Sequence, residues 1–301
     1  MVRLLACFLA LLSPVLALAA PRVVATTSDL GAIAREVGRD KVTVTALVGP
    51  TQDPHFVDAR PNLALELAKA DLLVLVGLDL EQGWLPTLVT GARNPKIQPG
   101  SPGYLDASTL VTLLDVPTQK IDRAMGDIHP GGNPHYLYDP RNAAPIARGI
   151  AKRLGGIDPQ NAAAYTANAE DFVKRLDAAR AGWEKALAGL RGKPVVTYHK
   201  SMPYLAAWLG FTVPVTIEPK PGIPPSPSHV AGVLATVQQQ NVKLILQEVY
   251  YPETTAQLVQ SKAGGTLVRI SGGTDLAAGQ TYLQRVDQMV KQLADAAAKG
   301  L

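Results

Sequence analysis

The sequence predicts an α/β protein with two lobes, each a mainly parallel sheet covered by helices, joined by one long rigid backbone helix. Three observations predict this fold. The chain has 301 residues, which is longer than a single core usually supports. Short, almost continuously apolar strands alternate with helical stretches in both halves, as is typical of parallel sheets covered on both faces. Between the halves runs one unbroken amphipathic helical pattern.

The first 19 residues read as a secretory signal peptide. Arg3 gives the positive start, 4–18 is an apolar run, and Ala-Leu-Ala at 17–19 is a typical cleavage site. The residues before Cys7 resemble a lipoprotein box, but almost no apolar stretch precedes that cysteine. We therefore expect a soluble periplasmic protein without a lipid anchor.

The composition of the full chain excludes several classes of protein. Apolar residues make up 47% and charged residues 18%, which indicates a globular core rather than disorder. Cys7 is the only cysteine, so the mature chain has neither disulfides nor a thiolate ligand. The net charge of +4 is spread along the chain without a basic cluster, so nucleic-acid binding is not predicted.

The first lobe is predicted to cover 20–157. Its expected strands and helices alternate, and a Pro- and Gly-rich irregular stretch from 94 to 133 contains one further expected strand. The expected strands are 22–27, 42–48, 72–76 and 110–116, and the expected helices are 30–37, 61–70, a stretch after 84, and 140–154.

The linking helix is predicted over 158–192. Asp158 is the expected N-cap and Pro159 the first helical residue. Apolar residues recur at spacings of three and four to Leu190, which places them on one face of a single helix. At 1.5 Å per residue these 35 residues span about 52 Å, long enough to connect two lobes.

The second lobe is predicted to cover 193–301 and to repeat the architecture of the first. The expected strands are 194–198, 212–217, 244–249 and 266–270, and the expected helices are 203–209, 228–240, 252–262 and 280–299.

Three histidines lie in settings that suggest one shared site. His55 follows Asp53-Pro54 after the second expected strand, and His199 ends the first strand of the second lobe. His135 lies between the restrained pair Asn133-Pro134 and the helix start Asp139-Pro140. Ligands of open α/β sheets bind beyond the carboxyl ends of the strands. Imidazoles gathered there with one carboxylate suit a metal such as zinc.

The other two histidines carry weaker signals. His129 lies in a Gly- and Pro-rich run, where a solvated histidine is expected, although such a residue could hold a metal transiently. His229 falls in the first turn of a helix, where a cation is mildly disfavoured, and we expect it at the surface.

Two carboxylates compete to be the fourth ligand. Glu248 ends an apolar strand, where a carboxylate is costly to bury unless it has a partner. Asp275 lies in a loop after the last strand, where it could equally be an ordinary turn residue. The residues themselves slightly favour Glu248.

At these positions the sequence resembles a known family, the zinc/manganese solute-binding proteins of bacterial ABC transporters. The resemblance rests on 52–55, 68–72, 133–140 and Tyr198-His199, and it covers essentially the whole mature chain. It implies that His55, His135 and His199 are metal ligands and that the ion is delivered to an ABC transporter permease. It would also point to Asp275 as fourth ligand, but Gly272-Gly273 and the short run that follows depart from the commoner loop.

The long His-rich loop of many zinc members is absent, so a metal-gathering loop is not predicted. Three imidazoles and one carboxylate favour zinc over manganese. We expect a monomer that is not an enzyme. The alternative is a secreted zinc-dependent hydrolase that uses the same histidines with Glu248 as general base, although the sequence contains no H-E-x-x-H motif.

Overall fold

The first lobe is built on a four-stranded parallel sheet in the order β2-β1-β3-β4. The computed structural model describes residues 19–119 and 129–299. Apolar, mostly β-branched or leucine-rich runs form the three longer strands, as the sequence predicts. The strands are β1 (Arg22–Thr27), β2 (Thr43–Val48), β3 (Leu72–Leu75) and β4 (Tyr104–Asp106).

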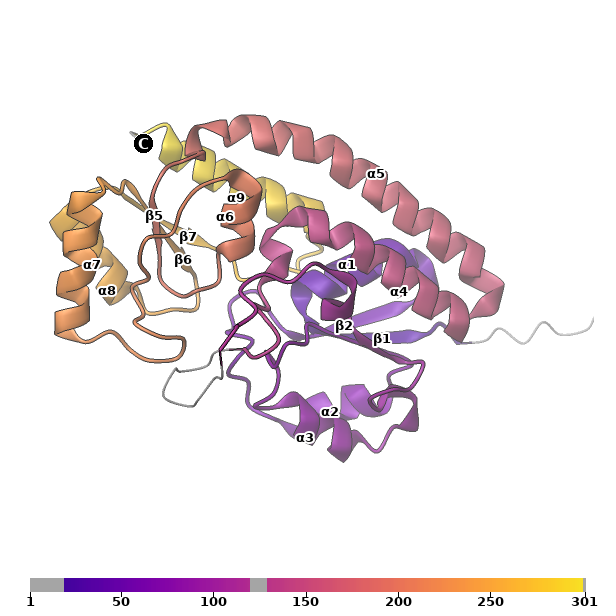
Figure 1. Cartoon of the computed structure of the whole chain (residues 1–301). Helices are drawn as coiled ribbons and strands as arrows, with labels where there is room; N and C mark the ends of the chain where they lie inside the picture. The colour runs from indigo at the N-terminus through magenta and orange to yellow at the C-terminus, as the bar shows by residue number, and fades with distance from the viewer. Residues whose placement is uncertain (1–18, 120–128, 300–301) are drawn as a thin grey trace, which may run out of the picture.

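Helices cover both faces of this sheet (Figure 1). One face packs against α1 (Ser28–Gly38) and α4 (Ala143–Ile157), and the other against α2 (Pro61–Ala68) and α3 (Leu85–Ala92). Strand side chains alternate between the two cores, as the pleat requires. Short 3₁₀ turns complete the lobe: Arg39–Lys41, Pro95–Ile97, Ala107–Leu110, Tyr136–Tyr138 and Pro140–Asn142.

The fourth strand of this sheet differs from the prediction. The expected strand at 110–116 is wrong: these residues begin at the end of a 3₁₀ turn and continue without regular structure. The edge is instead β4, whose Leu105 is buried between two half-buried neighbours. Three residues ending in a carboxylate are too few to show an alternating pattern in the sequence.

The connecting element is α5 (Ala162–Ala186), flanked by 3₁₀ turns at Pro159–Asn161 and Ala188–Leu190. It is shorter than predicted, about 38 Å for 25 residues. Asp158 does not cap it, because its carboxylate accepts hydrogen bonds from the side chains of Asn161 and Tyr165. The predicted apolar face is buried along the helix, which packs on α1 and α4 and reaches across to the second lobe (Figure 1).

The second lobe holds a three-stranded parallel sheet in the order β5-β6-β7. The strand expected at 212–217 is wrong, since only isolated bridges join Thr212 and Thr216 to the edge of β5. The elements are β5 (Val195–Thr197), α6 (Pro203–Leu209), α7 (Pro227–Gln239), β6 (Leu244–Glu248), α8 (Glu253–Ala263), β7 (Thr266–Ile270) and α9 (Tyr282–Ala297).

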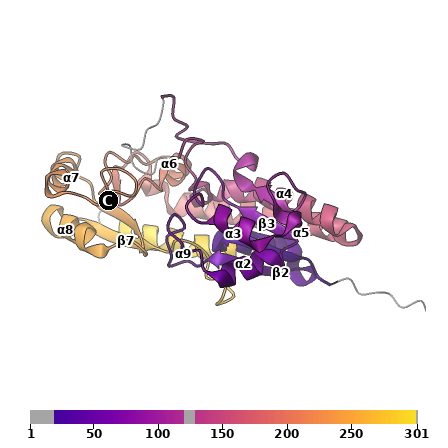
Figure 2. The same ribbon diagram turned by 90° about the horizontal axis from the view of Figure 1, so that it is seen from below.

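The lobes share buried contacts. One apolar core runs continuously from β1 and β3 through α5 and α9 to β5 and β6. Beside it, the buried Asp29 of α1 accepts hydrogen bonds of 2.8 and 2.6 Å from the backbone and hydroxyl of Thr274 in the second lobe. Figure 2 shows α9 lying between the lobes. The two sheets are therefore held in a defined relation, with their loops facing the junction.

Candidate metal site

His55 lies in the loop that follows β2, and Asp53 orients it. The Asp53 carboxylate accepts a 3.0 Å hydrogen bond from the His55 backbone and lies 2.7 Å from Nδ1. Burial alone raises the pKa of Asp53, but its hydrogen bonds and charge interaction with His55 outweigh this effect and hold the pKa below its ordinary value. The pair leaves Nε2 of His55 as the free ring nitrogen, which is buried without a partner.

His135 is fixed by the residues on either side of it. The Asn133 side chain accepts a 3.0 Å hydrogen bond from the His135 backbone. On the other side, Asp139 accepts from the Arg141 backbone and caps the 3₁₀ turn that leads into α4, where the sequence predicts a helix start at Asp139-Pro140. Burial lowers the pKa of His135 well below its ordinary value, and its Nε2 has no partner. The imidazole is therefore neutral, as a metal ligand must be.

His199 follows β5 and is oriented by a residue that sequence reasoning missed. Its Nδ1 lies 2.6 Å from the carboxylate of the buried Glu218, which also accepts a hydrogen bond from the backbone of Gly222. The Thr197 hydroxyl donates to the His199 carbonyl at 2.8 Å. A carboxylate on one ring nitrogen sets the tautomer and leaves the other nitrogen as the donor to a metal.

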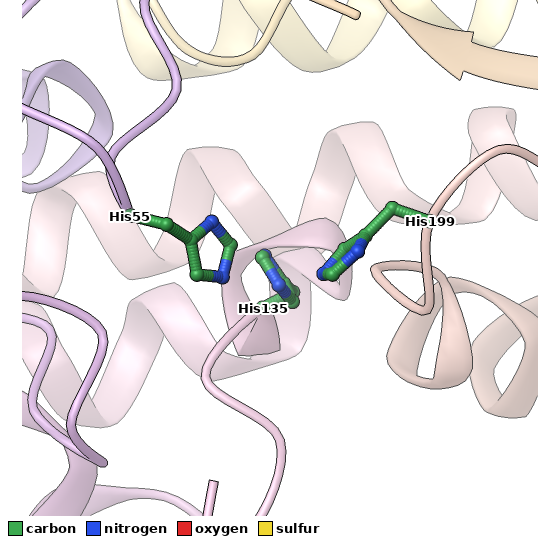
Figure 3. A group of neighbouring side chains, drawn as sticks. All are labelled: His55, His135 and His199. Atoms are coloured by element: carbon green, nitrogen blue, oxygen red, sulfur yellow. The ribbon is translucent and has the colours of Figure 1, made fainter. Parts of the chain in front are cut away.

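The structure brings the three predicted histidines together (Figure 3). The ring centroids of His55, His135 and His199 lie 5.1, 5.2 and 5.3 Å apart, and one ligand atom from each lies within 4.8 Å of the others. The Asn133 amide also donates to the carbonyl of Lys200 at 2.8 Å, which ties the His135 loop to the His199 loop. Buried ring nitrogens without partners fit a cation such as zinc, which binds neutral imidazole.

The two candidate carboxylates do not join this group. Glu248 is fully buried at the end of β6, where burial raises its pKa. One of its oxygens accepts from the Tyr138 hydroxyl at 3.3 Å, and the other has no partner. Asp275 is exposed, and its carboxylate accepts a hydrogen bond from the Ala278 backbone, as expected of an ordinary turn residue.

Of the two remaining histidines, His129 differs from the prediction, while His229 lies apart from the site. His129 is not solvated as predicted: it is half-buried, its Nε2 is fully covered, and its ring centroid lies 5.5 Å from that of His55. Burial lowers the pKa of His129 to about 4. His229 is half-buried on α7 and pairs through Nε2 with the carbonyl of Thr216, away from the other four.

Two parallel-sheet lobes, a long connecting helix and histidines gathered at the lobe junction define a solute-binding protein of the metal-binding class. Comparison with protein families agrees with this class. The chain belongs to the family described as Zinc-uptake complex component A periplasmic (ZnuA), whose model matches residues 23–296. Membership confirms the prediction that the chain is a transport component and not an enzyme, and it gives no support to the hydrolase alternative.

Individual relatives agree with this placement. The chain is 25% identical to the high-affinity zinc uptake system protein ZnuA of Paracoccus denitrificans, over 91% of each chain. It is 29% identical to a manganese ABC transporter substrate-binding lipoprotein of Streptococcus anginosus, over 52% of this chain and 48% of that protein.

Solved structures share the fold. A crystal structure of ZnuA has a TM-score of 0.76 at 21% identity, covering 92% of this chain and 99% of the other. The structure of the solute-binding protein FpvC of Pseudomonas aeruginosa in complex with Mn²⁺ has a TM-score of 0.74 at 26% identity, covering 93% and 99%. The predicted α/β fold of two lobes with parallel sheets flanked by helices is therefore confirmed.

The comparisons correct one expectation about location. The family is extracytoplasmic, as predicted. However, the streptococcal relatives are lipoproteins, so the expectation that no lipid anchor is present is not borne out. Cys7 and the predicted signal peptide up to residue 18 lie outside the described residues. Within those residues, every helix is too short or too polar to span a membrane.

Proposed function

We propose that this protein captures a divalent transition metal ion between its lobes and passes it to the membrane permease of an ABC transporter. One observation supports the proposal: three imidazoles from distant loops converge at the lobe junction, and Nε2 of His55 and of His135 is buried without a partner. We assign His55, His135 and His199 as ligands of the ion. Glu248 as fourth ligand stays a prediction, because its carboxylate lies outside the group that the three rings form.

The role of the bound ion is carriage and not catalysis. Hydrolytic metal sites keep a coordination position open for an activated water, whereas a shell filled by protein groups does not. Two of the three proposed ligands are each oriented by a buried or half-buried carboxylate, Asp53 or Glu218. These carboxylates hold the lone pairs toward the ion and offset part of its charge.

Zinc is the metal that this donor set favours. The relatives differ in the metal that their names give: the protein of Paracoccus denitrificans is named for zinc uptake, and that of Streptococcus anginosus for manganese. Imidazole nitrogens suit zinc, while manganese prefers carboxylate and water oxygens and lies lower in the general order of affinity. A site with three imidazoles therefore discriminates against manganese.

Competition between the two metals tests this preference. We expect chelator-stripped protein to bind zinc at least about tenfold more tightly than manganese in calorimetry, as the order of affinities implies. Tighter binding of manganese would overturn the assignment of zinc. Binding of neither ion would overturn the proposed function itself.

The partners follow from the transporter class. The permease receives the ion, and the ATPase of the transporter drives its passage. We expect the binding protein to act as a monomer, because one chain supplies all three imidazoles and the site needs no residue from a second copy.

A further inference from the structure

His129 carries a buried ring nitrogen that the proposed three-histidine site does not use. Its Nε2 has almost no exposed surface and no hydrogen-bond partner, while the ring is held by a hydrogen bond with the backbone of Leu78. A buried polar atom without a partner is costly, which makes each such atom a candidate for an absent ligand. The same feature marks Nε2 of His55 and His135.

The His129 ring lies beside the proposed site. Its centroid is 5.5 Å from that of His55, close to the 5.1–5.3 Å that separate the three proposed ligands from one another. A cleft of about 650 Å³ lies against the same two histidines and is also lined by Phe56 and Trp84. His129 therefore lies between the three-histidine group and this cleft. A fourth ligand in this position would complete the coordination shell of the ion.

The backbone around His129 is held in place. A turn joins the Gly132 backbone to the His129 carbonyl at 3.2 Å, and the Asn133 backbone donates to the Leu114 carbonyl at 2.9 Å. Gly132 has a φ of 122°, and a Cβ there would lie 3.1 Å from the Leu114 carbonyl oxygen, so glycine is needed for this close approach. This short segment thus carries two imidazoles, His129 and His135, to one place.

We propose that His129 supplies the fourth ligand, so that the ion is held by four imidazoles. This inference rests on the proposed function. A zinc ion bonds nitrogen at about 2.0–2.1 Å, which brings tetrahedral ligand atoms to about 3.3 Å from one another. The three grouped histidines are spread over as much as 4.8 Å, so their rings also draw together when the ion binds. His129 lies outside the group that the three rings form, so its ring must move further than theirs to enter the shell.

His129 fits this place better than Glu248 does. One Glu248 oxygen accepts a hydrogen bond from Tyr138, and the other, like Nε2 of His129, has no partner. The Arg285 guanidinium lies 5.0 Å from the centre of the Tyr138 ring, so Glu248 sits beside a cation that offsets its charge. His129 has aromatic contact with a proposed ligand, whereas Glu248 shows only a charge interaction with His199. An all-nitrogen shell also strengthens the preference for zinc over manganese.

Histidine side-chain NMR with ¹⁵N labelling tests the proposal, because the chain has only five histidines. One equivalent of zinc should move the ring nitrogens of four histidines to metal-bound shifts. In His129→Ala three should move, and zinc affinity should fall at least about tenfold, the lower end of the loss seen when a group that only orients a ligand is removed. His229→Ala is the matched control and should keep four shifted histidines and full affinity.

Two further results bear on the proposal. Glu248→Gln should keep four shifted histidines. If only three histidines respond in the unaltered protein and His129 does not, the inference is wrong while the proposed function stands. If no histidine responds to zinc, both are wrong.

Discussion

His135→Ala is expected to lower zinc affinity by at least about a hundredfold, beyond the loss caused by removing an orienting group. His135 is buried, and its Nε2 has no hydrogen-bond partner. Its loop is tied to the His199 loop through Asn133, which holds its ring beside the other two. Competition with a chromogenic chelator measures the affinity.

The matched control for this change is His229→Ala. It removes the same atoms from a half-buried histidine on α7 whose ring pairs with the Thr216 carbonyl. Zinc affinity should stay unchanged in the control. Equal affinity in His135→Ala and the unaltered protein, with both variants folded by circular dichroism, would remove His135 from the site.

Zinc is expected to raise the thermal stability of the metal-free protein strongly. A ligand that binds only the native state at a thousand times its dissociation constant stabilises that state by about 4 kcal/mol. For a chain of this size, each kcal/mol moves the melting temperature by roughly 2–4 °C, so a shift of roughly 8–16 °C follows. The reason is structural: the ion joins loops that belong to different lobes.

Scanning calorimetry of chelator-stripped protein, with and without zinc, measures this shift. His135→Ala at the same zinc concentration should lose most of it, since its site is incomplete. A shift of the same size in the variant would mean that zinc stabilises the protein through other groups.

Much of the fold follows from local patterns in the sequence. The strand at 22–27 was predicted with its observed bounds, because a β-branched apolar run has no competing reading. The linking helix was predicted from one continuous apolar face, although the side-chain bonds of Asp158 shift its start to Ala162. The edge strands of the two sheets were not predictable. The strand at 104–106 is too short to show an alternating pattern, and 212–217 pairs with its neighbour only at isolated bridges.

The site was predictable where its residues lie next to strong local signals. His55 and His135 stand beside prolines that restrain their loops, and His199 ends a strand. Glu218 gave no signal, because it meets His199 across 19 residues and only the fold shows the pairing. The burial of His129 was missed for a related reason. Its Gly- and Pro-rich surroundings are typical of exposed loops, but the Leu78 backbone and the His55 ring lie against it.

A zinc-bound crystal structure with anomalous diffraction measured on both sides of the zinc absorption edge tests the central claim most directly. We expect one strong anomalous peak at the lobe junction, about 2.0–2.1 Å from a ring nitrogen of each of His55, His135 and His199. A zinc peak elsewhere on the molecule, with these three rings unbound, would contradict it.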